Sequence, residues 1–149
     1  MSGKYMAYVG SYSYTGKAKG ITVYDVDVEN GVFKERCEME VDNSSYVIAS
    51  SDGKTLYSIA DEGVVSFRIL QNGSLARLNS SPIRGMRGCH LCTDMEDKYV
   101  FVSGYHDGKT TVLSLNKDGS VGEIVDEVYH KGYGSVAERN FRSHITCTR

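Results

Sequence analysis

Histidine, acidic and basic side chains gather where short strand-forming runs begin or end. His90 and His144 each begin such a run, and His106 lies in the turn that follows another strand-forming run. Three charged residues come shortly before His144: Glu138, Arg139 and Arg142. An acidic residue beside a histidine can activate water, and a guanidinium can hold an anion. The set therefore suits activation of water against an anionic substrate.

Each of these residues also has a purely structural explanation. His90 could pack against a neighbouring strand and bond to a backbone carbonyl, as buried histidines do. Glu138 and Arg139 could lie on a solvated loop, where such neighbours are common, and Arg142 could be a surface residue. Counted along the strands, His90 and His106 fall at the same end, which favours a shared role. Both explanations stay open on the residues alone.

The elements that must position these residues follow a repeated pattern. A short apolar run, a polar turn, two alternating runs and an Asn-Gly turn occupy residues 46–75. The same order returns in residues 89–121 and, more weakly, at the start of the chain. The closing turns stand at Gly31, Gly73 and Gly119, 42 and 46 residues apart. Since repeats of about 40 to 50 residues with four short strands are typical of propeller blades, we predict an all-β fold, a β-propeller of four-stranded antiparallel blades.

The repeat also sets the expected boundaries. A first blade is predicted at about residues 4–41, lacking one strand, a second at about 46–82, a third at about 89–128, and the first strand of a fourth at 144–149. Because propeller rings close with about four to eight blades, slightly more than three blades predict a portion of a longer ring. Its open sheet edges then predict self-association, or pairing with the missing blades.

Composition excludes several classes of protein. The chain has 149 residues and a formal net charge of −2, so it lacks the basic surface of a nucleic-acid-binding protein. No apolar run is long enough to cross a membrane, and the N-terminal residues MSGKYMAYVG lack the apolar region of a signal peptide. The sequence thus predicts no nucleic-acid or membrane partner and a cytoplasmic location.

Four cysteines are present, and two of them, Cys89 and Cys92, have the spacing of a zinc-binding pair. On a strand, residues three apart point to opposite faces, so the two thiols should diverge. No second pair in the sequence completes a set of four ligands. We therefore predict free thiols in a reducing compartment, and neither a metal site nor another cofactor.

The motifs themselves resemble those of a known family, the seven-bladed β-propeller lactonases. Seven stretches carry the resemblance: YVGSY (8–12), GITVYDVD (20–27), SSDGKTLYSI (50–59), GVVSFRI (63–69), GCHLCTD (88–94), KYVFVSGYH (98–106) and AERNFRSH (137–144). That family includes the propeller-type 6-phosphogluconolactonases and is similar in fold to the fungal muconate-lactonising enzymes. The resemblance implies a soluble enzyme of carbohydrate metabolism that opens a sugar lactone, in the best-known branch the 6-phosphogluconolactone of the pentose phosphate pathway. The chain would correspond to the N-terminal two-fifths of a typical member, about three of its seven blades.

The resemblance also implies roles for single residues. Family members carry an ER motif followed by a pair of histidines separated by one residue. Glu138 and Arg139 match the motif, His144 matches the second histidine, and Arg142 stands in place of the first. The resulting predictions are catalysis by His144, Glu138 and His90, and binding of a small anionic sugar lactone by Arg139, His106 and Arg142.

Two other functions remain compatible with the sequence. A propeller can serve as a non-catalytic binding module, because a fold alone does not determine function. A cycloisomerase of the muconate-lactonising type would share the fold. The 149 residues alone are expected to be inactive as a hydrolase, since the remaining blades would complete the site.

Overall fold

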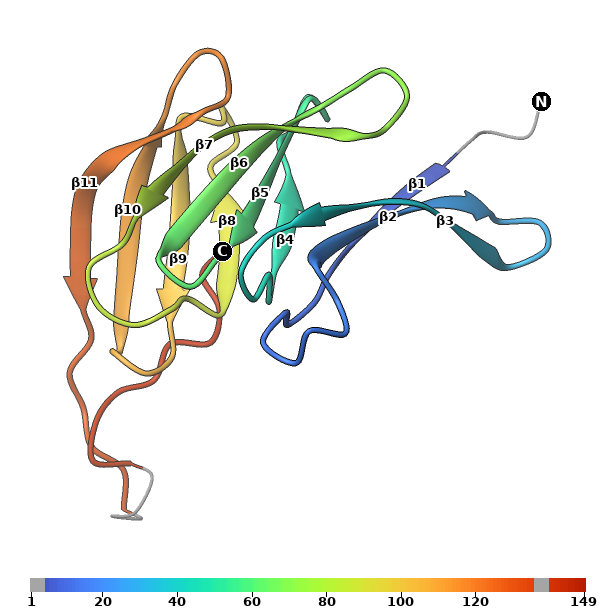
Figure 1. Ribbon diagram of the computed structural model, residues 1–149. Coiled ribbons are helices and arrows are strands. Elements are labelled where there is room, and N and C mark those ends of the chain that lie inside the picture. Colours follow the sequence, from blue (N-terminus) through green and yellow to red (C-terminus); the bar gives the residue numbers. More distant parts are fainter. Residues whose placement is uncertain (1–4, 136–139) are drawn as a thin grey trace.

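Three antiparallel sheets, placed side by side, make up the structure (Figure 1), a computed structural model that describes residues 5–135 and 140–149. The first sheet contains β1 (Tyr5–Gly10), β2 (Gly20–Asp27) and β3 (Val32–Glu40). The second contains β4 (Val47–Ala49), β5 (Thr55–Ile59), β6 (Gly63–Ile69) and β7 (Leu75–Pro82). The third contains β8 (His90–Thr93), β9 (Tyr99–Gly104), β10 (Lys109–Leu115) and β11 (Val121–Tyr129). The described residues form no helix, and so none that could cross a membrane, and the predicted all-β class is confirmed.

Each sheet repeats the same local irregularities, which supports a single repeated unit. The pairing of the last two strands shifts register in all three sheets, at Val23/Tyr24, Ser66/Phe67 and Val112/Leu113. The turn that joins those strands holds a glycine of positive φ each time: Gly31 (66°), Gly73 (81°) and Gly119 (85°). Glycine adopts this conformation at little steric cost, which explains why each of these turns ends on Asn-Gly or Asp-Gly.

The middle sheet is covered on both faces, and this explains why every residue of β5 is buried. Successive side chains on a strand point to opposite faces, so Leu56 packs towards the first sheet while Tyr57 and Ile59 pack towards the third. One apolar cluster joins the first and second sheets: Ile21, Val23, Val41, Leu56, Ala60, Val65, Phe67 and Leu75. Another joins the second and third: Tyr57, Ile59, Val64, Leu91, Val100, Val102, Leu113 and Val121.

Residues 144–149 run beside β8 but form no strand, which differs from the predicted first strand of a fourth blade. The segment contacts the third sheet through side chains. The Cys89 thiol lies 3.3 Å from the carbonyl oxygen of Ile145, and the hydroxyls of Ser103 and Thr148 are 2.8 Å apart. A strand forms when a neighbouring strand pairs with its backbone, and no described strand pairs with this segment.

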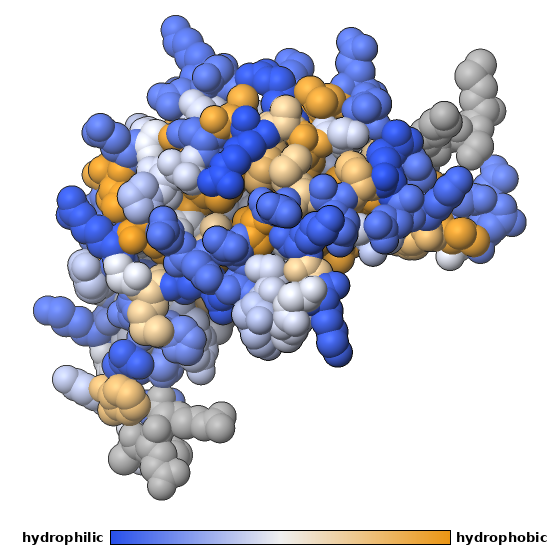
Figure 2. All heavy atoms as spheres, viewed as in Figure 1, coloured by the Kyte–Doolittle hydropathy of each residue, from blue (hydrophilic) through white to orange (hydrophobic). Residues whose placement is uncertain are grey.

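Apolar side chains on the mainly polar surface gather in limited areas (Figure 2). The face of the first sheet that points away from the second sheet carries Tyr5, Val9 and Phe33, all exposed. Tyr5 and Phe33 flank Val26 on the neighbouring strand, so they belong to one face. On the opposite face, Ile21 and Val23 are fully buried. The first sheet therefore has one covered and one uncovered apolar face.

Gly20 lies where the first sheet packs closely against Val41, the residue that follows β3. Its φ is +127°, and a Cβ there would collide with the backbone of Val41. Gly16 also has a positive φ, 71°, but nothing lies within 4 Å of where its Cβ would stand. In urea denaturation we expect Gly20→Ala to lower the free energy of unfolding by about 2–4 kcal/mol, and Gly16→Ala by about 1 kcal/mol. Equal losses of unfolding free energy in the two variants would contradict a costly collision with Val41.

We propose that the uncovered face of the first sheet causes the chain to self-associate, because exposed apolar sheet faces seek cover. Val9→Lys would place a charge on this face and should weaken the association by about tenfold or more. Val28→Lys is the matched control, since Val28 is also exposed but lies in the turn after β2. Sedimentation equilibrium measures both. A chain that stays monomeric at every concentration would refute the proposal.

Candidate functional site

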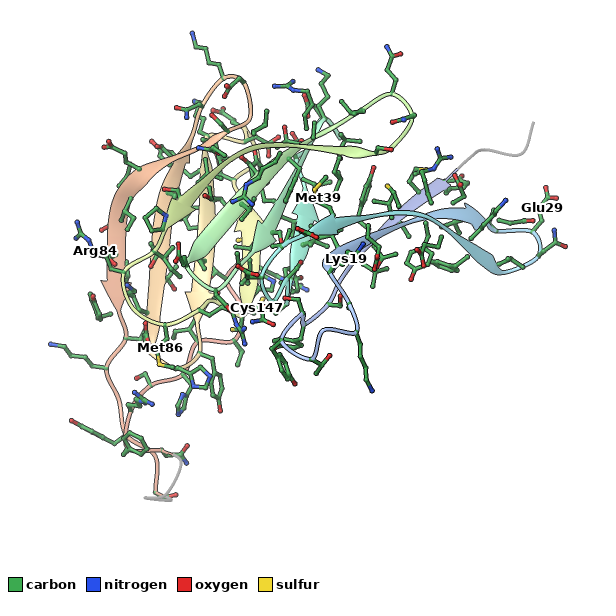
Figure 3. All side chains as sticks on the ribbon, viewed as in Figure 1. Lys19, Glu29, Met39, Arg84, Met86 and Cys147 are labelled. Carbon is green, nitrogen blue, oxygen red and sulfur yellow. The ribbon has the colours of Figure 1, made fainter. Side chains whose placement is uncertain are left out.

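His90 begins β8, at the end of the third sheet where the C-terminal segment passes (Figure 3). Its ring lies 4.6 Å from the ring of Tyr46, and its Nε2 lies 3.5 Å from the sulfur of Cys147. Its Nδ1 is buried and has no hydrogen-bond partner among the described residues. Burial, together with the nearby charge of Arg149, lowers the pKa of His90 below its ordinary value. Burial therefore favours the neutral form of this imidazole.

His144 is held by Tyr105, in the turn between β9 and β10. The two rings stack 4.3 Å apart, and Nδ1 of His144 lies 2.8 Å from the carbonyl oxygen of Tyr105. A carbonyl only accepts hydrogen bonds, so Nδ1 carries the proton and the lone pair of neutral His144 is on Nε2. His106 meets the same tyrosine ring edge-on, at 5.3 Å. His144 thus has the tautomer that a general base acting through Nε2 requires.

The environments of His90 and His144 are joined by one short segment. His144 contacts Tyr105, and three residues later Cys147 contacts His90. Three residues of extended chain span at most about 11 Å. The structure therefore places three of the predicted residues, His90, His106 and His144, at one end of the third sheet. Their individual roles remain predictions.

A cavity of about 480 Å³ opens at this end of the sheets, and of the three histidines only His106 is among its described lining residues. Connections from all three sheets contribute to its lining, with Tyr12 after β1, Ser45 before β4, Arg87 and Cys89 before β8, and Tyr105 and His106 after β9. The volume falls within the range of sites for small molecules. The hydroxyl of Ser45 is buried and has no hydrogen-bond partner among the described residues. The cavity thus combines aromatic walls with polar groups that could receive a ligand.

Arg87 is a candidate that the sequence patterns did not single out. Its guanidinium donates to Asp61 at 2.9 Å and lies 4.9 Å from the centre of the Tyr12 ring. The residue stands in GMRGC, a stretch with no strand periodicity and no recognised motif. Its place between two glycines, three residues before His90, is the one signal that could have drawn attention to it.

The loop before β8 is tied to the third sheet on its other side. The backbone N–H of Met86 donates to Asp107 at 2.6 Å. Lys109, whose side chain is 4% exposed, donates to the carbonyl oxygen of Arg84 and, at 2.6 Å, to Glu127. The hydrogen bond from Lys109 is the main reason that the pKa of Glu127 lies below its ordinary value. Figure 3 shows Met86 at this end of the sheet and Arg84 beside β11, so the loop that lines the cavity has a fixed support.

The other predicted residues are placed differently. Arg142 is exposed, its guanidinium lies 5.1 Å from the centre of the Phe141 ring, and it does not line the cavity. Glu138 and Arg139 fall outside the described residues. The four cysteines form no disulfide, three are partly buried, and Cys147 is exposed.

A larger groove, of about 730 Å³, lies between the second and third sheets at their opposite end. Its lining comes from three turns, residues 50–55, 96–98 and 115–119, together with Tyr57 and Arg68. Carboxylates and ammonium groups alternate along it, and none of its lining residues is a histidine. The histidine end of the sheets is therefore the better candidate for a chemical site.

Side-by-side antiparallel sheets, with a cavity and titratable groups at one end of the inner strands β4 and β8, define the architecture of a β-propeller. A family model described as "Lactonase, 7-bladed beta-propeller" matches residues 6–149. The chain belongs to the seven-bladed β-propeller lactonase family, and the predicted propeller fold is confirmed.

Known proteins agree with this assignment. A 6-phosphogluconolactonase of Bacillus subtilis is 33% identical over 147 residues, which are 95% of this chain and 42% of the relative. The crystal structure of a candidate 6-phosphogluconolactonase from Bacteroides fragilis matches with a TM-score of 0.90 and 31% identity, over 98% of this chain and 42% of that one. A similar protein from Bacteroides uniformis matches with a TM-score of 0.85 and 26% identity, over 93% and 41%. The chain thus spans about two-fifths of the length of the relatives it matches.

The burial of His90 gives a direct test of its surroundings. In a nuclear magnetic resonance titration we expect its pKa to lie below the ordinary 6.5, because desolvation disfavours the charged ring. Tyr46→Ala should expose the ring and move the pKa back towards 6.5, whereas Tyr14→Ala, at an exposed loop position, should not. The unfolded chain then binds this proton more tightly, so stability begins to fall as the pH drops below 6.5 and continues to fall through the lower pKa of the folded state. A measured pKa at or above 6.5 would contradict the buried environment.

Proposed function

We propose that this chain supplies the histidine-bearing part of a lactonase site that opens 6-phosphogluconolactone to 6-phosphogluconate. The observation that carries the proposal is the 2.8 Å contact between Nδ1 of His144 and the carbonyl oxygen of Tyr105, which assigns the proton of the neutral ring to Nδ1 and its lone pair to Nε2. Membership of the lactonase family and the names of its relatives support the substrate class. The 6-phosphogluconolactonase reaction belongs to the pentose phosphate pathway.

The proposed reaction begins with water. Nε2 of His144 takes a proton from a water molecule, whose oxygen forms a bond to the carbonyl carbon of the lactone. The bond from that carbon to the ring oxygen then breaks, and the proton passes from His144 to the released oxygen. One water and one lactone give one open-chain sugar acid, and no oxidant or reductant is needed.

The other predicted residues assist this step in the proposal. His90, whose neutral form burial favours, would relay a proton in this step. Glu138 would orient the water or the base. Arg139, His106 and Arg142 would hold the anionic sugar. Walls of the site beyond these residues would come from the part of the ring that the relatives have and this chain does not span.

The activity test uses a complete ring, made by joining residues 1–149 to the portion of the Bacillus subtilis relative that lies beyond its match. We expect this fusion to open 6-phosphogluconolactone, and the 149 residues alone to leave the spontaneous rate unchanged. His144→Ala in the fusion should lower kcat by about 10²–10⁴-fold, because a general base is lost. His130→Ala is the control, since His130 is exposed after the outer strand β11 and contacts neither Tyr105 nor His90 among the described residues.

Partial recovery of the His144→Ala rate by added imidazole would identify a lost base rather than a damaged fold. Unchanged kcat in both His144→Ala and His90→Ala would refute the proposed mechanism. Binding of 6-phosphogluconate without any turnover would favour the non-catalytic binding module instead, and turnover of a muconate would favour the cycloisomerase.

A further inference from the structure

Arg87 stands where residues from all three sheets meet. It lies in the connection that leads into the third sheet, and it pairs with Asp61, which follows β5 of the second sheet. Its guanidinium also lies over the ring of Tyr12, which follows β1 of the first sheet. A solvent-exposed surface arginine with no further role would not need partners from two other sheets. The position of this guanidinium is therefore built by the packing of the three sheets together.

Asn43 connects the two partners of Arg87 to each other. Its amide nitrogen donates to Asp61 at 2.8 Å, and its amide oxygen accepts from the backbone of Ser13 and Tyr14 at 3.0 and 3.1 Å. Its φ is +52°, a conformation uncommon for any residue but glycine. The single side chain thus joins the loop that carries Tyr12 to the carboxylate that holds Arg87.

Most donors of Arg87 stay available. A guanidinium has five N–H groups, and the hydrogen bond to Asp61 is the one that the described residues provide for it. The side chain is one-third exposed and lines the cavity of about 480 Å³, as does Ser45, whose buried hydroxyl has no hydrogen-bond partner among the described residues. A planar guanidinium fixed on one edge can bind the oxygens of an anion with its other edge.

We infer that Arg87 binds the phosphate of the substrate, with Ser45 as a second donor, and that Asp61 and Asn43 are positioning residues for it. The inference rests on the proposed lactonase function and names the residue that would distinguish a phosphorylated sugar lactone from its unphosphorylated counterpart. Arg87 is the one described cation in the cavity lining, whereas Arg142 lies outside that lining.

Binding of the reaction product tests this directly, because no turnover is needed. The full 149-residue chain is titrated with 6-phosphogluconate and, separately, with gluconate, while the Arg87 side-chain N–H resonance is followed by nuclear magnetic resonance. We expect 6-phosphogluconate to shift that resonance and to bind about tenfold or more tightly than gluconate, as a charge-assisted hydrogen bond predicts. Arg87→Gln should abolish the difference and leave gluconate binding unchanged.

Matched variants separate binding from folding. Arg84→Gln removes another arginine of the same loop, one whose side chain is 79% exposed and pairs with Glu127, and it should preserve the preference for phosphate. Asn43→Gly keeps the positive φ but removes the amide, so the preference should fall by a smaller factor, about threefold. A variant that merely loosened the fold would weaken both ligands equally.

The outcomes also distinguish this inference from the proposed function. Equal affinity for the two ligands, no binding of either, or an unchanged preference in Arg87→Gln would overturn the assignment of Arg87, even if the fusion hydrolyses the lactone. A phosphate preference that depends on Arg87, in a fusion that never opens the lactone, would uphold the assignment of Arg87 and refute the lactonase proposal.

Discussion

Everything in this structure depends on covering both faces of a flat, apolar sheet. The middle sheet has large side chains on each side, with Leu56 and Phe67 on one face and Tyr57 and Ile59 on the other, all nearly inaccessible to water. Neither cluster can form without a neighbouring sheet, because a sheet alone leaves at least one face in water. Burial at about 25 cal/mol per Å² of apolar surface therefore stacks the repeats side by side, and this stacking brings equivalent turns to the same end.

Polar contacts between the turns then fix the ends of the stacked sheets. At one end, Asp97 accepts hydrogen bonds from the backbone and hydroxyl of Ser51 in the neighbouring sheet. Asp97 has a φ of +50°, where the matching turn of the second sheet has Gly53, so these bonds offset a conformation that disfavours a side chain. At the other end, Asn43 also has a positive φ, and it donates a hydrogen bond to Asp61. Apolar stacking sets which sheets are neighbours, and these short polar ties set how their ends align.

The repeated sheets could be predicted from the sequence because they follow from periodicity. Features that depend on single contacts between distant residues could not. The turn glycines at 31, 73 and 119 revealed the repeat, because alternation and turn chemistry are local, and each of these glycines lies between two paired strands of the structure. The strand expected at 144–149 does not form, since pairing requires a partner that local pattern cannot supply. Arg87 had no periodic signal, and its importance emerges only when Asp61 and Tyr12, distant in sequence, are brought beside it.

The carboxylate beside Arg87 does not argue against anion binding at this guanidinium. Asp61 is half-exposed, and an ion pair of that kind contributes only about 0–1 kcal/mol, because solvent screens it. A charge-assisted hydrogen bond between a guanidinium and a phosphate contributes about 1.5–3 kcal/mol, so an arriving anion outweighs the repulsion from a screened carboxylate. The pair instead limits the rotamers of Arg87, with Tyr12 restricting the plane of the group. Asp61 thereby reduces the conformational entropy that a flexible arginine would lose on binding, which is a reason to place an acid next to the cation that receives an anion.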